Sequence, residues 1–398
     1  MTNESFFFAS CPTGSEELLL TELKSHKLFG KISRGGISFK AENKQAISFA
    51  VQTRIASRVY KEVHFFYIRH EKDIYPCAKK IKWEDYIKPQ HTFKISTLLD
   101  REANRVFRNS IFLSQLLKDS LVDQQRELFG KRSDVDTNNA DVSFLQRIEA
   151  TKQDFLAKVY VDLTGISLDK RGYRDSTHRA PLRENLAAAL VSSTSWKPKK
   201  DLFFDPMVGS GTLLIEAILL KAGITPSFIN LRNRIKFSFM KQDWFLNSDL
   251  KSWYNTFSEK LVEDAMREIE KFEQGTFFAN DIDAENIKFT ISHLRKVFGR
   301  ADFVTFFNED FLSMDNPLPG PATILFNPPY GERINPSSEI NEFYHDIGEV
   351  LKNKYQGSTA YIFTLHGDLR KNIRLKTTKK LPFFNGDLDC RLLEYKLE

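Results

Sequence analysis

The chain has 398 residues, of which 41% are hydrophobic and 28% are charged. This balance is typical of globular domains with buried cores, and it excludes a disordered or fibrous protein. The three cysteines, Cys11, Cys77 and Cys390, lie far apart, so they form neither a metal motif nor a disulfide framework, and they predict a cytoplasmic location. No apolar stretch is long enough to span a membrane.

The positive charge lies mainly in the first part of the chain. The net charge is +6, and residues 1–170 contain 27 Lys and Arg against 22 Asp and Glu. Such an excess suits a polyanionic partner, because phosphates attract Lys and Arg at long range. A solvated surface with a slight lysine bias would give the same count, so charge alone leaves both interpretations open.

Two small α/β units are expected before residue 166. The first, residues 1–60, has strand patterns at 6–9 and 37–39 and helix patterns at 15–24 and from 45 onward. The second, residues 61–165, has strand patterns at 63–68, 92–96 and 155–163 and a long amphipathic helix at 110–129. Residues 166–179 are expected to form a linker.

From about residue 180, strand-length and helix-length segments alternate. The expected strands are 202–205, 276–281, 303–307, 322–327 and 361–365, and the expected helices include 211–220 and 284–298. Such alternation predicts a parallel sheet covered by helices. In open sheets of this kind, ligands bind at the carboxyl ends of the strands, near the point where the strand order reverses.

The first motif is a glycine-rich turn between a strand and a helix. Its sequence is Asp205-Pro206-Met-Val-Gly209-Ser-Gly211-Thr212. A Walker loop would need a lysine after Gly211, and a dinucleotide fingerprint would need a third glycine. The remaining interpretation is a loop for S-adenosylmethionine, which has no pyrophosphate to cradle. A purely structural turn stays open as the alternative.

Acids follow three successive strands of this region. We expect Asp281 to accept the ribose hydroxyls of an adenosyl group and Asp310 to contact the adenine amine, by the logic of nucleotide-binding folds. Asp283 is better placed to cap the helix that follows. Each acid alone could equally be a cap or a solvated loop residue.

The third motif, Asn327-Pro328-Pro329-Tyr330, ends a strand. Two prolines fix an extended turn, so the Asn327 side chain and the Pro328 carbonyl could accept hydrogen bonds from the amino group of a flipped base. Tyr330 could stack on that base. A structural Pro-Pro turn is the alternative.

Together these motifs resemble the class I methyltransferases that modify exocyclic amines. Three longer stretches, at 170–174 (Lys-Arg-Gly-Tyr-Arg), 178–187 (His-Arg-Ala-Pro-Leu-Arg-Glu-Asn-Leu-Ala) and 327–333 (Asn-Pro-Pro-Tyr-Gly-Glu-Arg), narrow the resemblance. They are similar to the THUMP-domain RNA guanine-N2 methyltransferases, in particular the bacterial enzymes of 23S ribosomal RNA. The resemblance covers nearly the whole chain.

The resemblance implies a ferredoxin-like domain at 1–55, a THUMP RNA-binding domain at 56–165 and a Rossmann-like class I methyltransferase domain at 180–398, with a mostly parallel seven-stranded sheet. The implied donor is S-adenosylmethionine and the implied substrate is RNA; no metal, membrane or obligate protein partner is implied. The implied cofactor residues are Asp205, Pro206, Gly209, Gly211, Thr212, Asp281 and Asp310. The implied catalytic residues are Asn327, Pro328, Pro329 and Tyr330, and Arg174, Arg179, Arg183 and Arg333 are candidate RNA contacts.

Two positions depart from the family pattern. Val208 stands where the family loop usually has Cys, and Ala279 stands where it often has Gly. Neither position needs side-chain chemistry, so the expected activity is unchanged. Two other functions stay open: methylation of adenine N6 in RNA or DNA, and a non-catalytic RNA-binding assembly factor.

Overall fold

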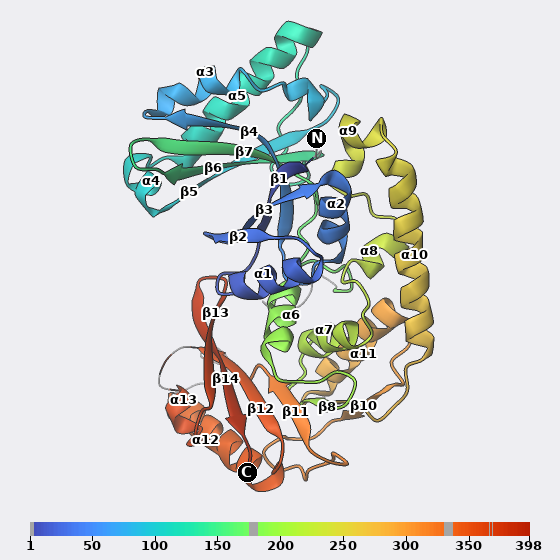
Figure 1. Ribbon diagram of the computed structural model, residues 1–398. Coiled ribbons are helices and arrows are strands. Elements are labelled where there is room, and N and C mark those ends of the chain that lie inside the picture. The colour runs from blue at the N-terminus through green and yellow to red at the C-terminus, as the bar shows by residue number, and fades with distance from the viewer. Residues whose placement is uncertain (1–3, 175–181, 330–336, 366, 368) are drawn as a thin grey trace. The chain divides into compact units, whose positions relative to one another are not determined.

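The computed structural model describes residues 4–174, 182–329, 337–365, 367 and 369–398 (Figure 1). The chain divides into two compact units. The first contains the residues up to Cys11, then Leu19–Leu168 and Arg234–Ser258, and the second contains Pro12–Leu18, Asp169–Asn233 and Glu259–Glu398.

The first unit is built on one seven-stranded sheet with the order β2-β3-β1-β4-β7-β6-β5. The strands are β1 (Glu4–Ser10), β2 (Gly30–Ser33), β3 (Gly36–Glu42), β4 (Arg58–Ile68), β5 (Phe93–Leu99), β6 (Val142–Ala150) and β7 (Phe155–Asp162). Strand β4 pairs with β1 through its first residues and with β7 from Tyr60 to Ile68. The two α/β units expected from the sequence therefore share a single sheet.

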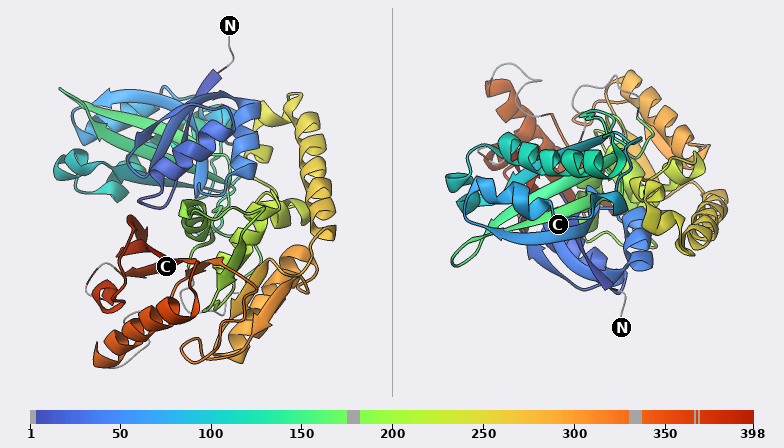
Figure 2. Two further views of the ribbon diagram at one scale, coloured as in Figure 1. Left: turned by 60° about the horizontal axis from the view of Figure 1, so that its bottom comes forward. Right: turned by 90° about the horizontal axis from the view of Figure 1, so that it is seen from above.

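Helices cover one face of the β4–β7–β6–β5 half of this sheet. They are α3 (Ile74–Ala78) and α5 (Ser110–Phe129), which Figures 1 and 2 show lying across the strands. Leu113, Leu117 and Leu121 recur every four residues along α5 and are fully buried, as helical periodicity predicts. They pack with Phe66 and other side chains from the strands into one core. Helix α5 ends at Gly130, which adopts a left-handed conformation with φ 67°.

The remaining helices of this part of the chain are shorter than α5. They are α1 (Glu16–Ser25), α2 (Asn43–Gln52), α4 (Arg101–Val106) and α9 (Asp243–Leu246). Residues Arg234–Ser258 join this unit although they follow the glycine-rich motif in sequence. An ion pair between Lys241 and Asp141 attaches them, and so does the Phe239 amide, which donates to the Leu163 carbonyl at 3.0 Å.

The second unit has a seven-stranded sheet with the order β10-β9-β8-β11-β12-β14-β13. The strands are β8 (Leu202–Asp205), β9 (Phe277–Asn280), β10 (Val304–Phe307), β11 (Ala322–Phe326), β12 (Thr359–Leu365), β13 (Lys379–Asn385) and β14 (Leu388–Lys396). The helices are α6 (Glu184–Ser193), α7 (Thr212–Lys221), α8 (Phe228–Arg232), α11 (Ala284–Phe298), α12 (Ser337–Lys354) and α13 (Leu369–Asn372), with α10 (Leu250–Glu270) running from one unit into the other.

The strand order places a switch point beside β8. From β8 the chain adds β9 and β10 on one side and then β11 and β12 on the other, and all these neighbours pair in parallel. Strand β14 runs antiparallel to β12, and β13 runs antiparallel to β14. The expected Rossmann-like, mostly parallel sheet is confirmed. Its carboxyl-end switch point is where such folds bind ligands.

Candidate active site

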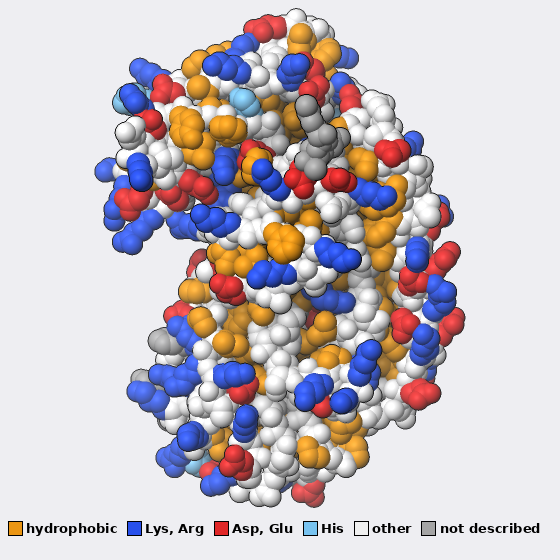
Figure 3. All heavy atoms as spheres, viewed as in Figure 1, with side chains coloured by type: hydrophobic (Ala, Val, Ile, Leu, Met, Phe, Trp, Pro, Cys, Tyr) orange, Lys and Arg blue, Asp and Glu red, His pale blue; other side chains and the backbone are white. Residues whose placement is uncertain are grey.

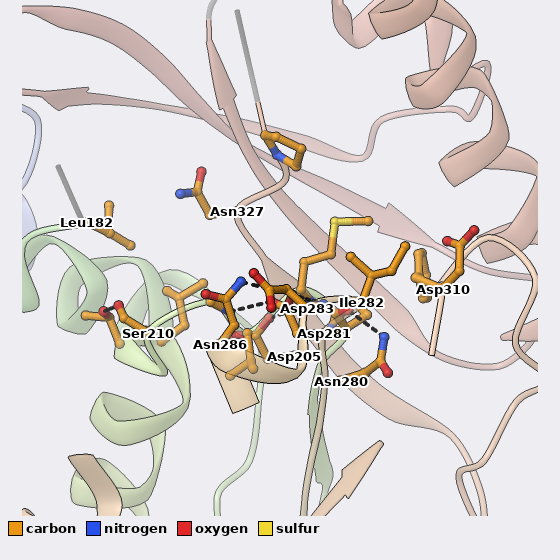
Figure 4. Close-up of a pocket in the computed structure, with 18 of the residues that line it drawn as sticks. Leu182, Asp205, Ser210, Asn280, Asp281, Ile282, Asp283, Asn286, Asp310 and Asn327 are labelled. Carbon is orange, nitrogen blue, oxygen red and sulfur yellow. Dashed lines mark hydrogen bonds between the residues drawn. The ribbon is translucent and has the colours of Figure 1, made fainter. Parts of the chain in front are cut away.

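A cavity of about 610 Å³ opens at the carboxyl ends of the central strands of the second unit (Figure 4). Its walls come from the turn after β8, the residues after β9 and β10, and the end of β11. Most of the site residues predicted from the sequence line it: Asp205, Pro206, Gly209, Thr212, Asp281, Asp310, Asn327 and Pro329. A volume of this size is in the range of small-molecule and cofactor sites.

The glycine-rich turn depends on two left-handed residues. Gly209 has φ 52° and Gly211 has φ 80°, a region that side chains with a Cβ rarely adopt. A Cβ added at Gly211 would also lie 2.7 Å from Thr290 Cγ2 on α11. Because the Thr290 hydroxyl donates to the Gly209 carbonyl at 2.9 Å, the turn is held against α11 and opens α7 at the floor of the cavity.

Asp281 organises this turn. Its carboxylate accepts the Gly209 amide at 2.8 Å, the Asp283 amide at 3.0 Å and the Asn286 side-chain amide at 3.0 Å. A carboxylate has about four acceptor positions, so three internal bonds leave roughly one for a ligand. The sequence predicted a ligand contact at Asp281 and did not predict this structural role.

Asn280 is a site residue to which the sequence assigned no role. Its side-chain amide donates to the carbonyls of Pro206 and Glu309, both at 3.0 Å, and its Oδ1 accepts the Glu309 amide at 3.1 Å. Fully buried, it ties together the segments that follow β8, β9 and β10. An amide that both donates and accepts at a strand end, next to Asp281, is the signal that could have identified it.

The two other acids lie in contrasting surroundings. Asp205 is buried, and this burial raises the pKa of its carboxyl well above the usual value, with the Asp281 charge adding to the rise and a bond from the Met207 amide at 3.2 Å opposing it. Asp310 is exposed at the rim, where it accepts the Leu312 amide at 3.0 Å. Burial therefore shifts Asp205 toward its neutral form relative to a solvated carboxyl, whereas Asp310 lines the cavity at its exposed rim.

Asn327 lies where β11 ends, with the buried Pro328 and the cavity-lining Pro329 after it. Its Oδ1 is buried and has no hydrogen-bond partner within the described part of the chain. An unsatisfied buried acceptor costs about 1–3 kcal/mol, so such an atom is typical of a place where a ligand supplies the missing donor. Figure 4 shows Asn327 across the cavity from the Asp281 cluster. Tyr330 lies outside the described residues.

Of the four arginines predicted to contact RNA, the structure describes Arg174 and Arg183, and their surroundings differ. The Arg174 side chain is only 14% exposed; it pairs with Glu184 at 3.5 Å, donates to the Leu182 carbonyl at 2.6 Å and contacts the Thr212 hydroxyl. These bonds direct its guanidinium into the unit, which favours a role in holding the cavity rim over contact with RNA. Arg183 is exposed just before α6, and Arg179 and Arg333 lie outside the described residues.

Buried charged side chains lie next to the residues of the cavity rim. Arg171 pairs with Glu216 of α7 at 3.1 Å, and both side chains are almost fully buried. Burial also raises the pKa of Glu184 to about 7, although the nearby Arg174 opposes the rise. The motif at 170–174 thus contributes a charge network beneath the glycine-rich turn, which the sequence alone did not reveal.

Two general properties complete the site's setting. None of the described helices has the length and apolar character needed to cross a bilayer. Within the same residues, no group of three or more His, Cys, Asp or Glu side chains could hold a metal ion.

Three family models match the chain. Residues 171–394 match an RMKL-like methyltransferase domain, residues 69–152 match a THUMP domain, and residues 6–60 match an RlmL ferredoxin-like domain. These matches agree with the three kinds of domain that the sequence predicted. The finer boundaries at 55, 165 and 180 stay predictions.

Curated relatives extend over the same residues. The chain is 30% identical to a putative RNA methyltransferase of Synechocystis sp., covering 98% of this chain and 96% of the relative. It is 30% and 31% identical to proteins of Aeromonas hydrophila and Allochromatium vinosum that are named ribosomal RNA large subunit methyltransferase K/L, covering 98% and 100% of this chain. The chain spans about half the length of these two relatives, 54% and 52%.

Solved structures share the fold. The chain resembles a putative methyltransferase, SMU.472, complexed with SAH, with a TM-score of 0.80, 23% identity and coverage of 100% of this chain and 99% of the other. It also resembles a possible methylase of Clostridium difficile, with a TM-score of 0.81, 23% identity and coverage of 99% and 98%. At this identity the likeness supports the fold alone.

Proposed function

Because the chain belongs to the RMKL-like methyltransferase family, we propose that it transfers the methyl group of S-adenosylmethionine to the exocyclic N2 amine of a guanine in RNA, with 23S ribosomal RNA as the substrate. The observation that carries the proposal is the unpartnered, buried Oδ1 of Asn327 on the wall of the cavity. An amine N–H is the donor that this acceptor lacks.

The cavity fits the donor molecule in size and in chemistry. The turn at Gly209 and Gly211 leaves space beside its backbone, since a Cβ at Gly209 would meet no atom within 4 Å. It also opens α7, whose first amides can receive a carboxylate. Asp281 and Asp310 each retain acceptor capacity for hydroxyl or amino groups, and apolar walls come from Leu182, Ile282 and Phe311.

When bound, S-adenosylmethionine supplies an activated methyl group on a sulfonium. Asn327 Oδ1 and the Pro328 carbonyl each accept a hydrogen bond from the target amine. These two hydrogen bonds direct the lone pair of the nitrogen into the cavity. These bonds also stabilise the positive charge that develops on the nitrogen. Correct orientation alone can contribute roughly 7–11 kcal/mol to the lowering of the barrier. Held by the glycine-rich turn and Asp281, the donor would supply its methyl group to the oriented nitrogen, and the surplus amine proton would pass to water.

The test is tritiated-methyl transfer from S-adenosylmethionine to total RNA, with nucleosides identified by mass spectrometry. The proposal expects N2-methylguanosine in large-subunit ribosomal RNA. If the product is N6-methyladenosine, the target base is adenine and not guanine, since Asn-Pro-Pro-Tyr suits either amino group. Tight cofactor binding without any transfer to RNA would instead favour the non-catalytic alternative.

A further inference from the structure

Two buried side chains of α11 bond to the backbone of the glycine-rich turn, and none of the sequence motifs included them. Thr290 is fully buried, and its hydroxyl donates to the Gly209 carbonyl at 2.9 Å. His293 is 1% exposed, and its Nδ1 lies 2.9 Å from the Ser210 carbonyl. Because a carbonyl only accepts hydrogen bonds, Nδ1 carries the proton in this contact. The two residues share one face of the helix, and together they hold two consecutive carbonyls of the turn.

These bonds determine where one amide of the turn points. In a planar trans peptide, the carbonyl of one residue and the amide of the next residue point in opposite directions. Since Thr290 holds the Gly209 carbonyl against α11, the Ser210 amide is directed away from α11. Ser210 lines the cavity, whereas neither Thr290 nor His293 does (Figure 4). The Ser210 amide is therefore a donor on the cavity side of the turn.

The neighbouring amides of the turn are already engaged. The Gly209 amide donates to the Asp281 carboxylate at 2.8 Å, and the Gly211 amide donates to the Val208 carbonyl at 2.8 Å. Within the described part of the chain, no hydrogen bond uses the Ser210 amide. The turn thus offers one oriented donor beside the first amides of α7, an arrangement that suits a carboxylate.

The buried motif at 170–174 supports the same arrangement. The ring of Tyr173, which is fully buried, lies 5.6 Å from the His293 ring at an angle of 58°. Dense packing of this kind restricts the rotation of the histidine side chain. Arg174 contacts the Thr212 hydroxyl at the start of α7. The motif therefore contacts both a residue that holds the turn and the helix that follows the turn.

Resting on the proposed function, we propose that Thr290 and His293 are positioning residues for the amino-acid part of the cofactor. They orient the Ser210 amide toward the carboxylate of bound S-adenosylmethionine and do not touch the cofactor themselves. The adenosyl part is assigned to other groups, Asp281 and Asp310, so its binding should depend little on the two α11 side chains. This difference between the two halves of the cofactor makes the proposal testable.

The test compares the binding of two ligands to the full chain by calorimetry. S-adenosylhomocysteine carries the carboxylate, and 5′-methylthioadenosine has the same adenosyl part without the amino acid. Thr290→Val keeps the shape of the side chain and removes its donor, whereas Thr290→Ser keeps the hydroxyl. At the second position, His293→Leu removes the donor, and His293→Asn retains an N–H close to the place of Nδ1.

The matched control is Thr194→Val. It removes another hydrogen bond from a threonine hydroxyl to a backbone carbonyl, that of Thr194 to Val191 at 2.8 Å, in a residue that does not line the cavity. Unfolding in urea verifies that each variant is folded. Each α11 position tests the proposal separately if a variant at the other position does not fold.

The proposal expects Thr290→Val and His293→Leu to bind S-adenosylhomocysteine roughly tenfold more weakly, because the carboxylate loses a well-directed donor. Both variants should bind 5′-methylthioadenosine as the wild type does. Thr290→Ser, His293→Asn and the control should bind both ligands as the wild type does.

Three results would overturn the proposal. Equal weakening for the two ligands would mean a general distortion of the cavity. Unchanged binding of S-adenosylhomocysteine would mean that the Ser210 amide is not used or not oriented by α11. A loss in Thr290→Ser as large as that in Thr290→Val would show that the hydroxyl is not the cause.

Failure here is separable from failure of the proposed function. If the wild type methylates RNA and Thr290→Val shows no selective loss, the activity stands and the positioning role fails. If the selective loss is found and the wild type transfers no methyl group to RNA, the positioning role stands and the proposed activity fails.

Discussion

The two sheets of this protein place their polar groups in opposite ways. In the second unit, Asp205, Asn280 and Asp281 are less than a tenth exposed and are bonded to one another's loops at the strand ends. In the first unit, cations such as Arg34, Arg101 and Arg108 are exposed at the surface. Figure 3 shows Lys and Arg side chains gathered over the part of this unit where Figure 1 draws α4 and β5. Burial fixes direction and strengthens each electrostatic interaction, whereas exposed cations attract a polyanion without fixing it. The contrast separates an ordered chemical site from a surface for capture.

The largest effect is expected where a buried charge loses its partner. Arg171→Met leaves Glu216 buried without this ion pair, and breaking such a pair typically costs about 3–5 kcal/mol. The free energy of unfolding, measured in urea, should fall by this amount. The double variant Arg171→Met/Glu216→Leu should recover most of the loss. No recovery would mean that the pair's other contacts dominate and that burial is not the cause.

The next effect is expected for Asn327→Ala, and it concerns the rate of methyl transfer. Removing one preorganised electrostatic partner lowers turnover about 10²–10³-fold, while binding of S-adenosylmethionine should hardly change. Single-turnover kinetics at saturating cofactor measure the first effect and calorimetry measures the second. A matching loss of cofactor affinity would show that Asn327 shapes the cavity and does not act on the amine.

Asp281→Ala should weaken cofactor binding by roughly 1.5–3 kcal/mol, because a charged acceptor of three internal bonds and a proposed ligand bond is lost. Asp310→Ala, at the exposed rim, should cost less. Calorimetry compares the two. Equal losses would contradict the organising role assigned to Asp281.

The last effect concerns pH. The raised pKa of Glu184, about 7 because of burial, means that the folded protein holds this proton more tightly than the unfolded chain does. Its contribution to stability is fully present below the unfolded pKa of about 4.5 and is lost as the pH rises through about 7. Glu184→Gln should therefore gain stability relative to the wild type between pH 5 and 8 in urea titrations. A constant difference would show that Glu184 does not titrate in this window.

The sequence predicted regular elements best where periodicity was strong. The limits of α5 and α11 and of β8 agree with the expectation, and β9 to β12 lie within two residues of it at each end. It missed β6, because Val142–Ala150 is buried on both faces over most of its length and shows little alternation. It also missed the pairing of β4 with both β1 and β7, since long-range register leaves no local pattern.

Within the site, the motifs identified the lining residues but not their supports. Glycines and acids at strand ends are visible in a sequence because their spacing is local. The supporting contacts join residues that no local pattern connects. Asn280 bonds to Glu309, and Arg174 bonds to Glu184 and Thr212, two residues that lie within helices. Residues Arg234–Ser258 join the first unit through contacts such as Lys241 with Asp141, about a hundred positions away, and no composition shift marks them.

The division between an ordered chemical site and a capture surface can be tested in one crossed measurement. Single-turnover methyl transfer is followed against RNA concentration for the wild type, Asn327→Ala and the variant Arg34→Gln/Arg101→Gln/Arg108→Gln, which removes exposed charge from the first unit. We predict that Asn327→Ala lowers the rate constant at saturating RNA with little change in half-saturation. The arginine variant should raise half-saturation and reach the wild-type rate constant. An intact saturated rate in Asn327→Ala, or a lowered saturated rate with unchanged half-saturation in the arginine variant, would contradict the account.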